Sequence, residues 1–425
     1  MASGPLAGVR VLEFSVILAA PFGTMQLADM GADVIKVESP PAGDAARTIG
    51  GAALPGNSKF FQVLNRGRRS LAVDLHTPEG RELIHRIVRE MDVVYVNYRP
   101  GVAKRLGIDY ETLAAITPNL IYAEIAGYGF EGPMADRAAS DIAASAYGGV
   151  VALTDAYEDD GAPRSLHPPI SGDQPTGLAT ALGILAALYH RERTGEGQVV
   201  RGSLLRSVMH MTSWLNSLDP AQDPTSRDLV VEAMRRVRAE GGSYDDLIRA
   251  RTGVRPPQLY FRSYRAGDGG LILGALTPAN RDAIRRALEL QGRDSDEPGF
   301  NPASADGRAL LEQREHEIKA LLMTRTVAEW MERLEAEGAP ASRVNFPEDL
   351  IDDPQASLHY VSVEHPLSGT TRQVAPMVDM SRTPTAVQGP APLLGQHSAE
   401  IAREFGYSDD QVAALVRAGV LMTAQ

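Results

Sequence analysis

The sequence predicts an α/β fold in which helices cover both faces of a mostly parallel sheet. Over roughly the first 200 residues, short apolar runs alternate with helix-like stretches, and the runs that predict strands are residues 9–14, 34–38, 93–97 and 120–125. Parallel strands joined by helices need right-handed crossovers, which place the helices on the two faces. Ligands of such sheets bind where the strands' carboxyl ends open into loops, here after Phe14, Glu38, Asn97 and Ile125.

Start and stop signals mark the helices of this pattern. Gly31 suits the left-handed position after one helix, and Pro78 suits the first turn of another, where its missing N–H costs nothing. We expect helices at residues 21–30, 78–90 and 175–190, a strand at 198–201 and a further helix from Ser203.

After about residue 220 the sequence changes in character. Residues 226–251 are highly charged, which predicts exposed helices, and strands at 258–261 and 271–273 are followed by helices from Asn280, Gly307 and Val327. We therefore expect residues 1–220 to form the first part of a large domain, 221–256 a charged helical linker, 257–345 a small α+β domain, and 346–425 a return linker and C-terminal helices that complete the large domain.

The composition excludes several classes of protein. A net charge of -12 argues against a general nucleic-acid binder, and the absence of cysteine excludes disulfides, thiolate catalysis and cysteine-based zinc sites. The nine histidines show no metal-binding spacing, so we expect no metal. The N-terminus does not look like a secretory signal, and no apolar run approaches the roughly 20 residues that span a bilayer. We expect a cytoplasmic protein that does not bind membranes.

The loop after the first predicted strand argues against a dinucleotide enzyme. Such enzymes place a G-x-G-x-x-G sequence there to cradle a pyrophosphate. This chain has Ser15 to Pro21 in that place, with no glycine before Gly23, so we do not expect NAD to bind.

Asp173 lies at the start of the long apolar helix and allows two interpretations. Its carboxylate could cap the helix by accepting hydrogen bonds from free N–H groups. The same carboxylate could instead attack an acyl carbon while neighbouring N–H groups stabilise the oxyanion, with Gly172 and Gly177 allowing a substrate to approach the backbone. The local sequence leaves both interpretations open.

Arginines near the predicted strand ends favour an anionic ligand. They occur in the segment 65–69, at Arg99 and Arg105, and at Arg137, and arginine binds phosphates through paired hydrogen bonds. Tyr98 adds an aromatic face on which a purine ring could stack.

An ordered series of segments resembles family III CoA-transferases. The resemblance is carried by residues 6–14, 20–22, 27–38, 97–101, 119–123, 127–133, 136–137, 194–198, 394–397 and 406–408. It implies an interlocked homodimer of two ring-like chains, each with a Rossmann-like large domain and a small domain. It also implies that coenzyme A and acyl-CoA are substrates, with no permanently bound cofactor.

By this resemblance Asp173 is the catalytic nucleophile. Its carboxylate attacks an acyl-CoA thioester to give a mixed anhydride, and the CoA thiolate then forms an aspartyl-CoA thioester and releases the donor acid. An acceptor acid then runs the same two steps in reverse and leaves as its CoA thioester. By matched position the CoA site is lined by Ala19, Val73, His76, Asn97, Tyr98, Arg105 and Arg137. His76 stands where one branch has lysine, and Arg137 lies one residue from a family lysine whose phosphate contact it takes over.

At three places the sequence differs from related branches of the family, and these differences reduce the number of candidate reactions. Ser140 stands where the racemase branch has a histidine, and serine is no base near neutral pH. Val16 and Leu18 replace polar residues of the formyl-CoA/oxalate branch, and only Gly269 and Gly270 remain of its four-glycine run, so a less polar acid is expected to meet Val16, Leu18, Ser140 and Gly172. CoA transfer to a carboxylic acid is the first hypothesis, a 2-methylacyl-CoA racemase the second, and a non-catalytic CoA-binding protein the third.

Overall fold

The computed structural model describes residues 4–424 except 52–53, 55, 100, 154–155, 159–160, 165–170, 254–257, 296 and 303. The chain divides into two compact units. The first unit comprises Met1–Ser217 and His359–Gln425, and the second comprises Leu218–Leu358.

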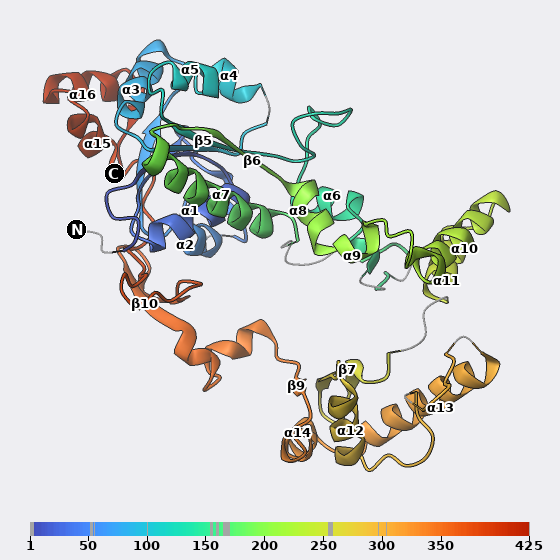
Figure 1. Cartoon of the computed structure of the whole chain (residues 1–425). Coiled ribbons are helices and arrows are strands. Elements are labelled where there is room, and N and C mark those ends of the chain that lie inside the picture. Colours follow the sequence, from blue (N-terminus) through green and yellow to red (C-terminus); the bar gives the residue numbers. More distant parts are fainter. Residues whose placement is uncertain are drawn as a thin grey trace. The chain divides into compact units, whose positions relative to one another are not determined.

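A seven-stranded sheet organises the first unit (Figure 1), in the order β12-β3-β2-β1-β4-β5-β6. Its strands are β1 (Arg10–Phe14), β2 (Asp33–Glu38), β3 (Arg68–Val73), β4 (Val93–Val96), β5 (Ile121–Ala126), β6 (Val199–Ser203) and β12 (Leu421–Met422). All neighbours pair in parallel except β12, which is antiparallel to β3. The predicted α/β fold is confirmed. Because β1 lies between β2 and β4, the strand order reverses there, and the loops after β1 and β4 flank the position where such sheets bind ligands.

Helices cover both faces of this sheet because its strands are apolar on both sides. Leu12 and Phe14 of β1 face a core completed by α3 (Pro78–Val88), α15 (Ser398–Glu404) and α16 (Asp409–Arg417). Val11 faces the opposite core, which contains α1 (Ala19–Asp29), α7 (Asp173–Thr194) and α8 (Leu204–Met211). The shorter helices of the unit are α2 (Lys59–Leu64), α4 (Val102–Leu106), α5 (Tyr110–Ala114), α6 (Asp141–Tyr147) and α9 (Ser213–Asn216).

Helices α1 and α7 meet backbone to backbone through a pair of glycines. A Cβ atom on Gly177 would lie 2.2 Å from the carbonyl oxygen of Ala19, and one on Gly23 would lie 2.6 Å from that of Gly177. Only glycine permits such an approach. The contact fixes the first turn of α7, and therefore Asp173, beside the residues that follow β1.

Most of the predicted elements occur within a few residues of their expected positions. Helix α7 starts two residues before the expected Pro175 and continues to Thr194. Among the elements that were not predicted are β3 and the hairpin of β10 (Tyr360–His365) and β11 (Gly369–Val374). Strand β3 places Arg68 and Arg69 inside the sheet, whereas the sequence had suggested loop positions.

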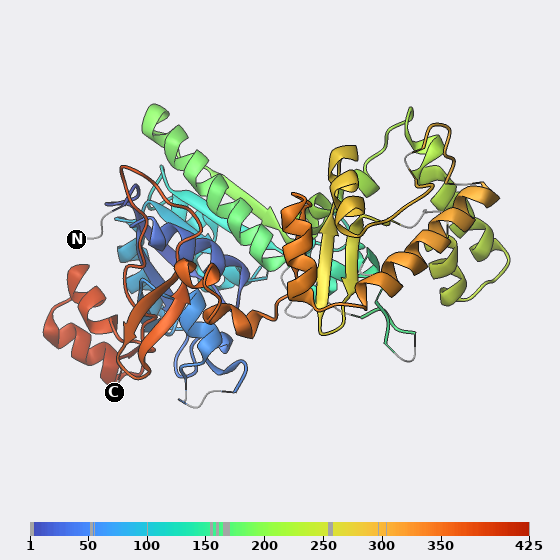
Figure 2. The same cartoon turned by 90° about the horizontal axis from the view of Figure 1, so that it is seen from below.

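The second unit contains a three-stranded antiparallel sheet in the order β7-β8-β9, and Figure 2 shows β7 and β8 side by side in yellow. One face of the sheet packs on Trp330 and Ile318 in a separate core. The elements are α10 (Arg227–Ala239), α11 (Tyr244–Thr252), β7 (Phe261–Arg265), β8 (Gly270–Gly274), α12 (Pro278–Ala287), α13 (Ala305–Leu322), α14 (Val327–Ala336) and β9 (Ala341–Arg343). Of the helices in the described chain, none combines the length and apolarity needed to cross a bilayer.

Candidate active site

The loop between β1 and α1 is held in place by side chains from other loops. Asn97, directly after β4, accepts a hydrogen bond from the Val16 N–H at 2.9 Å and donates one to the Val16 carbonyl at 2.8 Å. Asp44 accepts a hydrogen bond from the Ile17 N–H at 2.9 Å. These bonds hold Ile17 at φ +68°, a conformation that β-branched residues rarely adopt, and leave its side chain 39% exposed.

Buried charges lie beneath this loop. The Lys36 ammonium is 3.0 Å from an Asp44 carboxylate oxygen and 3.5 Å from one of Glu13, and it donates to the Ser15 carbonyl oxygen at 3.0 Å. Arg68 lies 3.3 Å from the other oxygen of Glu13. Burial alone would raise the pKa of Asp44, but Lys36 and the hydrogen bonds from the N–H groups of Ala46 and Ile17 together hold the pKa below its usual value. The loop is therefore supported by an ionised, paired cluster that fixes the position of Ser15.

Three of the arginines that suggested an anionic ligand are engaged in internal ion pairs. Arg66 pairs with Asp29 at 2.6 Å, Arg69 pairs with Asp33 at 2.6 Å, and Arg68 belongs to the buried cluster. Carboxylates of α1, β1 and β2 therefore neutralise these three arginines within the fold, and nothing in the structure assigns them a ligand. Arg99, Arg105 and Arg137 are exposed and form no ion pair with any described residue.

The remaining residues expected to bind CoA fall into two groups. Ala19 and Leu18 are buried at the start of α1, and Tyr98 is half-buried next to Asn97. Burial, with the negative charges of Asp44 and Glu38, raises the pKa of Tyr98 and keeps its hydroxyl protonated.

The second group lies at the end of β3. The Val73 side chain is fully buried in the core, so only its backbone can meet a ligand, whereas His76 is exposed.

Asp173 does not cap its own helix. It is the first residue of α7, and the residue at the capping position is Gly172, which has no side chain. The cap comes instead from Asp141 at the start of α6, whose Oδ2 accepts the N–H groups of Gly172 at 2.8 Å and Asp173 at 2.7 Å. The interpretation of Asp173 as a helix cap was therefore wrong.

The Asp173 carboxylate accepts no hydrogen bond and forms no ion pair within the described part of the chain. Burial raises its pKa from the ordinary 3.8 to about 7, and the negative charge of Asp141 contributes to the rise. A partly buried carboxylate without a partner, and with a pKa near neutrality, is typical of a reactive group. The first residues of α7 and α8 lie close together, because a Cβ atom on Gly172 would be 3.6 Å from the Cβ of Leu204. The N-termini of two helices therefore face this place, and helix N-termini favour an anion.

Ser140, which precedes Asp141, is exposed, and its hydroxyl oxygen accepts the N–H of Ala143 at 3.4 Å. It caps α6. No group of three or more acidic or histidine side chains in the described residues could hold a metal ion.

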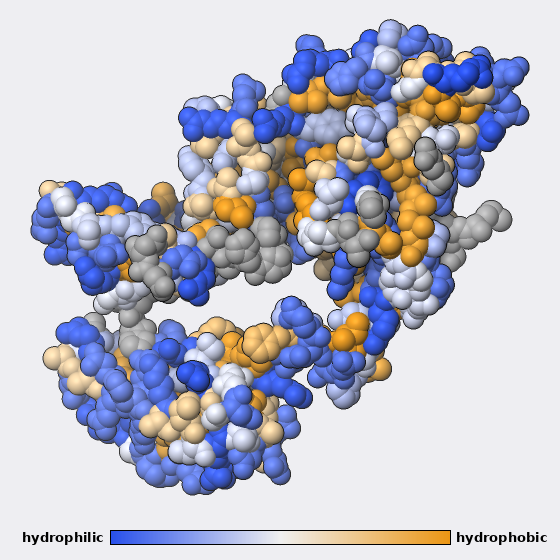
Figure 3. All heavy atoms as spheres, turned by 180° about the vertical axis from the view of Figure 1, so that it is seen from behind, coloured by the Kyte–Doolittle hydropathy of each residue, from blue (hydrophilic) through white to orange (hydrophobic). Residues whose placement is uncertain are grey.

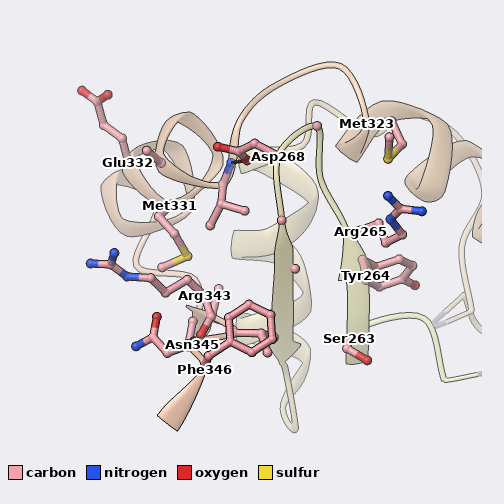
Figure 4. Close-up of a pocket in the computed structure, with 18 of the residues that line it drawn as sticks. Ser263, Tyr264, Arg265, Asp268, Met323, Met331, Glu332, Arg343, Asn345 and Phe346 are labelled. Carbon is pink, nitrogen blue, oxygen red and sulfur yellow. Dashed lines mark hydrogen bonds between the residues drawn. The ribbon is translucent and has the colours of Figure 1, made fainter. Parts of the chain in front are cut away.

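A large cavity in the second unit offers no comparable carboxylate. It has a volume of about 1820 Å³ and is lined by β7, β8, β9 and α14 (Figure 4). Asp268 accepts the Val327 N–H at 2.7 Å, while Glu332 and Glu335 are exposed to solvent. Arg265 and Arg343 have no acidic partner among the described residues, but nothing here resembles the half-buried carboxylate of Asp173.

Fold and site together define a doubly wound α/β protein with an unpartnered carboxylate beside its ligand-binding edge. The family model for CoA-transferase family III matches residues 6–398. The chain belongs to this family, and it is a CoA-transferase.

Relatives with named activities are similar along almost their whole length. Succinyl-CoA:mesaconate CoA-transferase of Haloarcula hispanica is 32% identical over 95% of this chain and 97% of its own. Succinyl-CoA:glutarate CoA-transferase of Homo sapiens is 29% identical over 98% and 90%. Among solved structures, a CAIB/BAIF family protein from Brucella suis superposes with a TM-score of 0.71 at 29% identity, covering 95% of this chain and 100% of that one.

The sequence missed the residues that support the site. Asn97 was expected to contact CoA, whereas the hydrogen bonds between its side chain and Val16 were not predicted. Asp141, Asp44 and Lys36 had no assigned role. One signal was available, because a lysine in the middle of the apolar run of β2 is an unusual residue for a buried strand.

Proposed function

We propose that this enzyme transfers coenzyme A from succinyl-CoA to a dicarboxylic acid, with the Asp173 carboxylate as covalent nucleophile. The observation that carries the proposal is the Asp173 carboxylate at the start of α7, which has no partner among the described residues, since a group that structure alone required would be bonded. The choice of succinyl-CoA and a dicarboxylate rests on the names of the relatives, several of which pair succinyl-CoA with such acids.

Each step of the proposed reaction conserves the thioester energy. An Asp173 oxygen bonds to the succinyl carbonyl carbon and the CoA thiolate leaves. The thiolate then attacks the aspartyl carbonyl carbon, and succinate departs with the oxygen that Asp173 had contributed. An acceptor carboxylate attacks the aspartyl-CoA thioester, and the returning thiolate takes the acceptor's acyl group, so one acceptor oxygen stays on Asp173.

The residues around Asp173 suggest how the substrates lie. The acyl group meets Val16 and the exposed Ile17, since Leu18 is buried. The phosphates of CoA bind the exposed cations Arg105 and Arg137, and the exposed His76, which stands in place of a lysine, is a further candidate contact. Asn97 acts by shaping the loop rather than by contacting CoA through its amide.

We also propose the interlocked homodimer. Orange apolar surface is exposed on the face that Figure 3 shows. The large apolar side chains exposed on the single chain include Leu182 at 69% and Tyr189 at 66% on α7 and Trp214 at 75% on α9. A second chain would cover such surfaces. Sedimentation of the purified protein tests the stoichiometry.

Oxygen labelling tests the covalent mechanism. With acceptor acid carrying ¹⁸O in its carboxylate, label should enter Asp173 and then appear in the succinate released by the next turnover. Asp173→Ala should abolish both turnover and labelling while keeping CoA binding. Succinate that stays unlabelled during turnover would contradict the nucleophile. Deuterium entering the α-carbon of acyl-CoA in heavy water, without exchange of CoA between acids, would indicate a racemase. A protein that shows no turnover, no labelling of Asp173 and no deuterium exchange would be non-catalytic.

A further inference from the structure

Asp141 is a buried acid that no step of the proposed reaction uses. Its side chain is 5% exposed, and its two oxygens have separate functions. Oδ1 accepts the Ser145 hydroxyl at 3.1 Å within α6. Oδ2 accepts two N–H groups at the start of α7, which lie 31 and 32 residues further along the chain.

This arrangement leaves the Asp173 side chain free. An acid at a helix start ordinarily folds back onto the N–H groups of its own first turn, and such a bonded carboxylate is a poor nucleophile. Here Asp141 already occupies the N–H groups of Gly172 and Asp173, and Pro175 has none. The N–H of Gln174 alone remains in this turn without an acceptor among the described residues. The oxyanion of the proposed reaction therefore cannot use the two N–H groups nearest to the nucleophile.

We propose that Asp141 is a positioning residue for CoA transfer: by capping α7 from α6, it keeps the Asp173 carboxylate unbonded and directed at the substrate. This inference rests on the proposed role of Asp173 as nucleophile. A second hydrogen-bonded contact supports the same turn, because the Thr176 hydroxyl donates to the Gly172 carbonyl at 2.6 Å and lies 2.8 Å from the Ser207 hydroxyl of α8.

The charge of Asp141 also acts on the nucleophile. It is the one charged group that raises the pKa of Asp173 in addition to burial. The first turn of α1, which packs on α7, has no titratable side chain, and α8 contacts α7 through Ser207 while its Arg206 is exposed. Removing the charge while keeping the hydrogen bonds should therefore extend the activity to lower pH.

Two substitutions separate the hydrogen bonds from the charge. In Asp141→Asn the amide oxygen can accept both N–H groups, whereas Asp141→Ala loses the bonds and the charge. Ser145→Ala is the matched control, since it removes a hydrogen bond to Asp141 and leaves the cap intact. The measurement is the rate at which the aspartyl-CoA thioester forms in a single turnover with succinyl-CoA, followed by hydroxylamine trapping and mass spectrometry between pH 5.5 and 8.5.

The Asn variant should form the adduct at the wild-type rate at pH 8, with its acidic limb moved down by about one pH unit. The Ala variant should form it about 100-fold more slowly with CoA affinity unchanged within about 3-fold. Wild-type rates in the Ala variant, or an unmoved acidic limb in the Asn variant, would overturn the role of Asp141. If the Ala variant does not fold, the Asn profile decides. A wild-type enzyme without any adduct at Asp173 would instead remove the proposed nucleophile.

Discussion

Replacing Asp173 by Asn removes a charge that the fold holds in a partly buried place, and the consequence for stability can be calculated. The pKa of Asp173 rises from 3.8 to about 7, so the native state binds the proton more tightly than the unfolded state between these values. The free energy of unfolding therefore falls as pH rises through this window. A difference of about 3 pH units corresponds to about 4 kcal/mol, which solvent near the partly exposed carboxylate reduces to about 2 kcal/mol.

The Asn variant lacks this titration. It should unfold with the same free energy as the wild type near pH 4 and be more stable by about 2 kcal/mol at pH 8. Urea titrations at fixed protein concentration, since assembly also affects stability, give the two free energies.

Asp246→Asn is the control, because Asp246 is exposed and its bonds to Arg249 and Ser243 lower its pKa to about 2. Its effect should not change between pH 5 and 8. If the Asp173 variant is no more stable than the wild type at pH 8, or if its advantage grows as the pH falls, the destabilising effect of the buried carboxylate is refuted.

Three other substitutions test the framework of the site. Gly177→Ala should lower the free energy of unfolding by about 3 kcal/mol in urea titrations, because the new methyl group would overlap the Ala19 carbonyl. Asn97→Ala should lower kcat/KM for succinyl-CoA by about 10- to 100-fold in steady-state assays, since Val16 loses both of its bonds to the side chain. Lys36→Met should lower the free energy of unfolding by about 3 to 5 kcal/mol at pH 8, because the carboxylates of Glu13 and Asp44 lose their cation. The loss should be smaller at pH 5, where these carboxylates can take up protons, and urea titrations at the two pH values measure the difference.

Each substitution has a result that would count against it. Ala414→Ser, on the exposed side of α16, should stay within about 0.5 kcal/mol of the wild type, so a loss of equal size there would show that the Gly177 result is not specific to the contact with Ala19. Unchanged kinetics in the Asn97 variant would show that the loop keeps its shape without the amide. A Lys36 variant equally unstable at both pH values would argue against unpaired carboxylates as the cause.

The parts of the fold that could be predicted are those in which a local pattern is sufficient. Strands β1, β2, β4 and β5 are apolar runs bounded by polar residues, and the sequence places them within a residue or two. Strand β3 begins Arg68-Arg69-Ser70, which does not look like a buried strand. It is one because Glu13 and Asp33 on other strands pair with the two arginines, and those contacts exist only after folding.

In the site, too, the local sequence could locate residues but could not predict contacts between segments that are distant in the sequence. Gly172 and Asp173 could be located from sequence and resemblance, but the local sequence could not tell a cap from a reactive acid. The answer depends on Asp141, which reaches the start of α7 because α6 and α7 both pack against α8. Likewise Asn97 was recognised as a site residue, while its bonding to Val16 depends on the adjacency of β1 and β4.

The hydrogen bonds that shape the loop after β1 have a consequence for how this scaffold can change. Asn97, Asp44 and Lys36 bind only main-chain N–H and C=O groups at residues 15–17, apart from a second Lys36 contact with the Ser15 hydroxyl. The side chains of Val16 and Ile17 take no part in holding the loop. The shape of the loop and its selectivity therefore depend on different residues. Substitutions at Val16 and Ile17 can change which acid the enzyme accepts without breaking the hydrogen bonds that hold the loop.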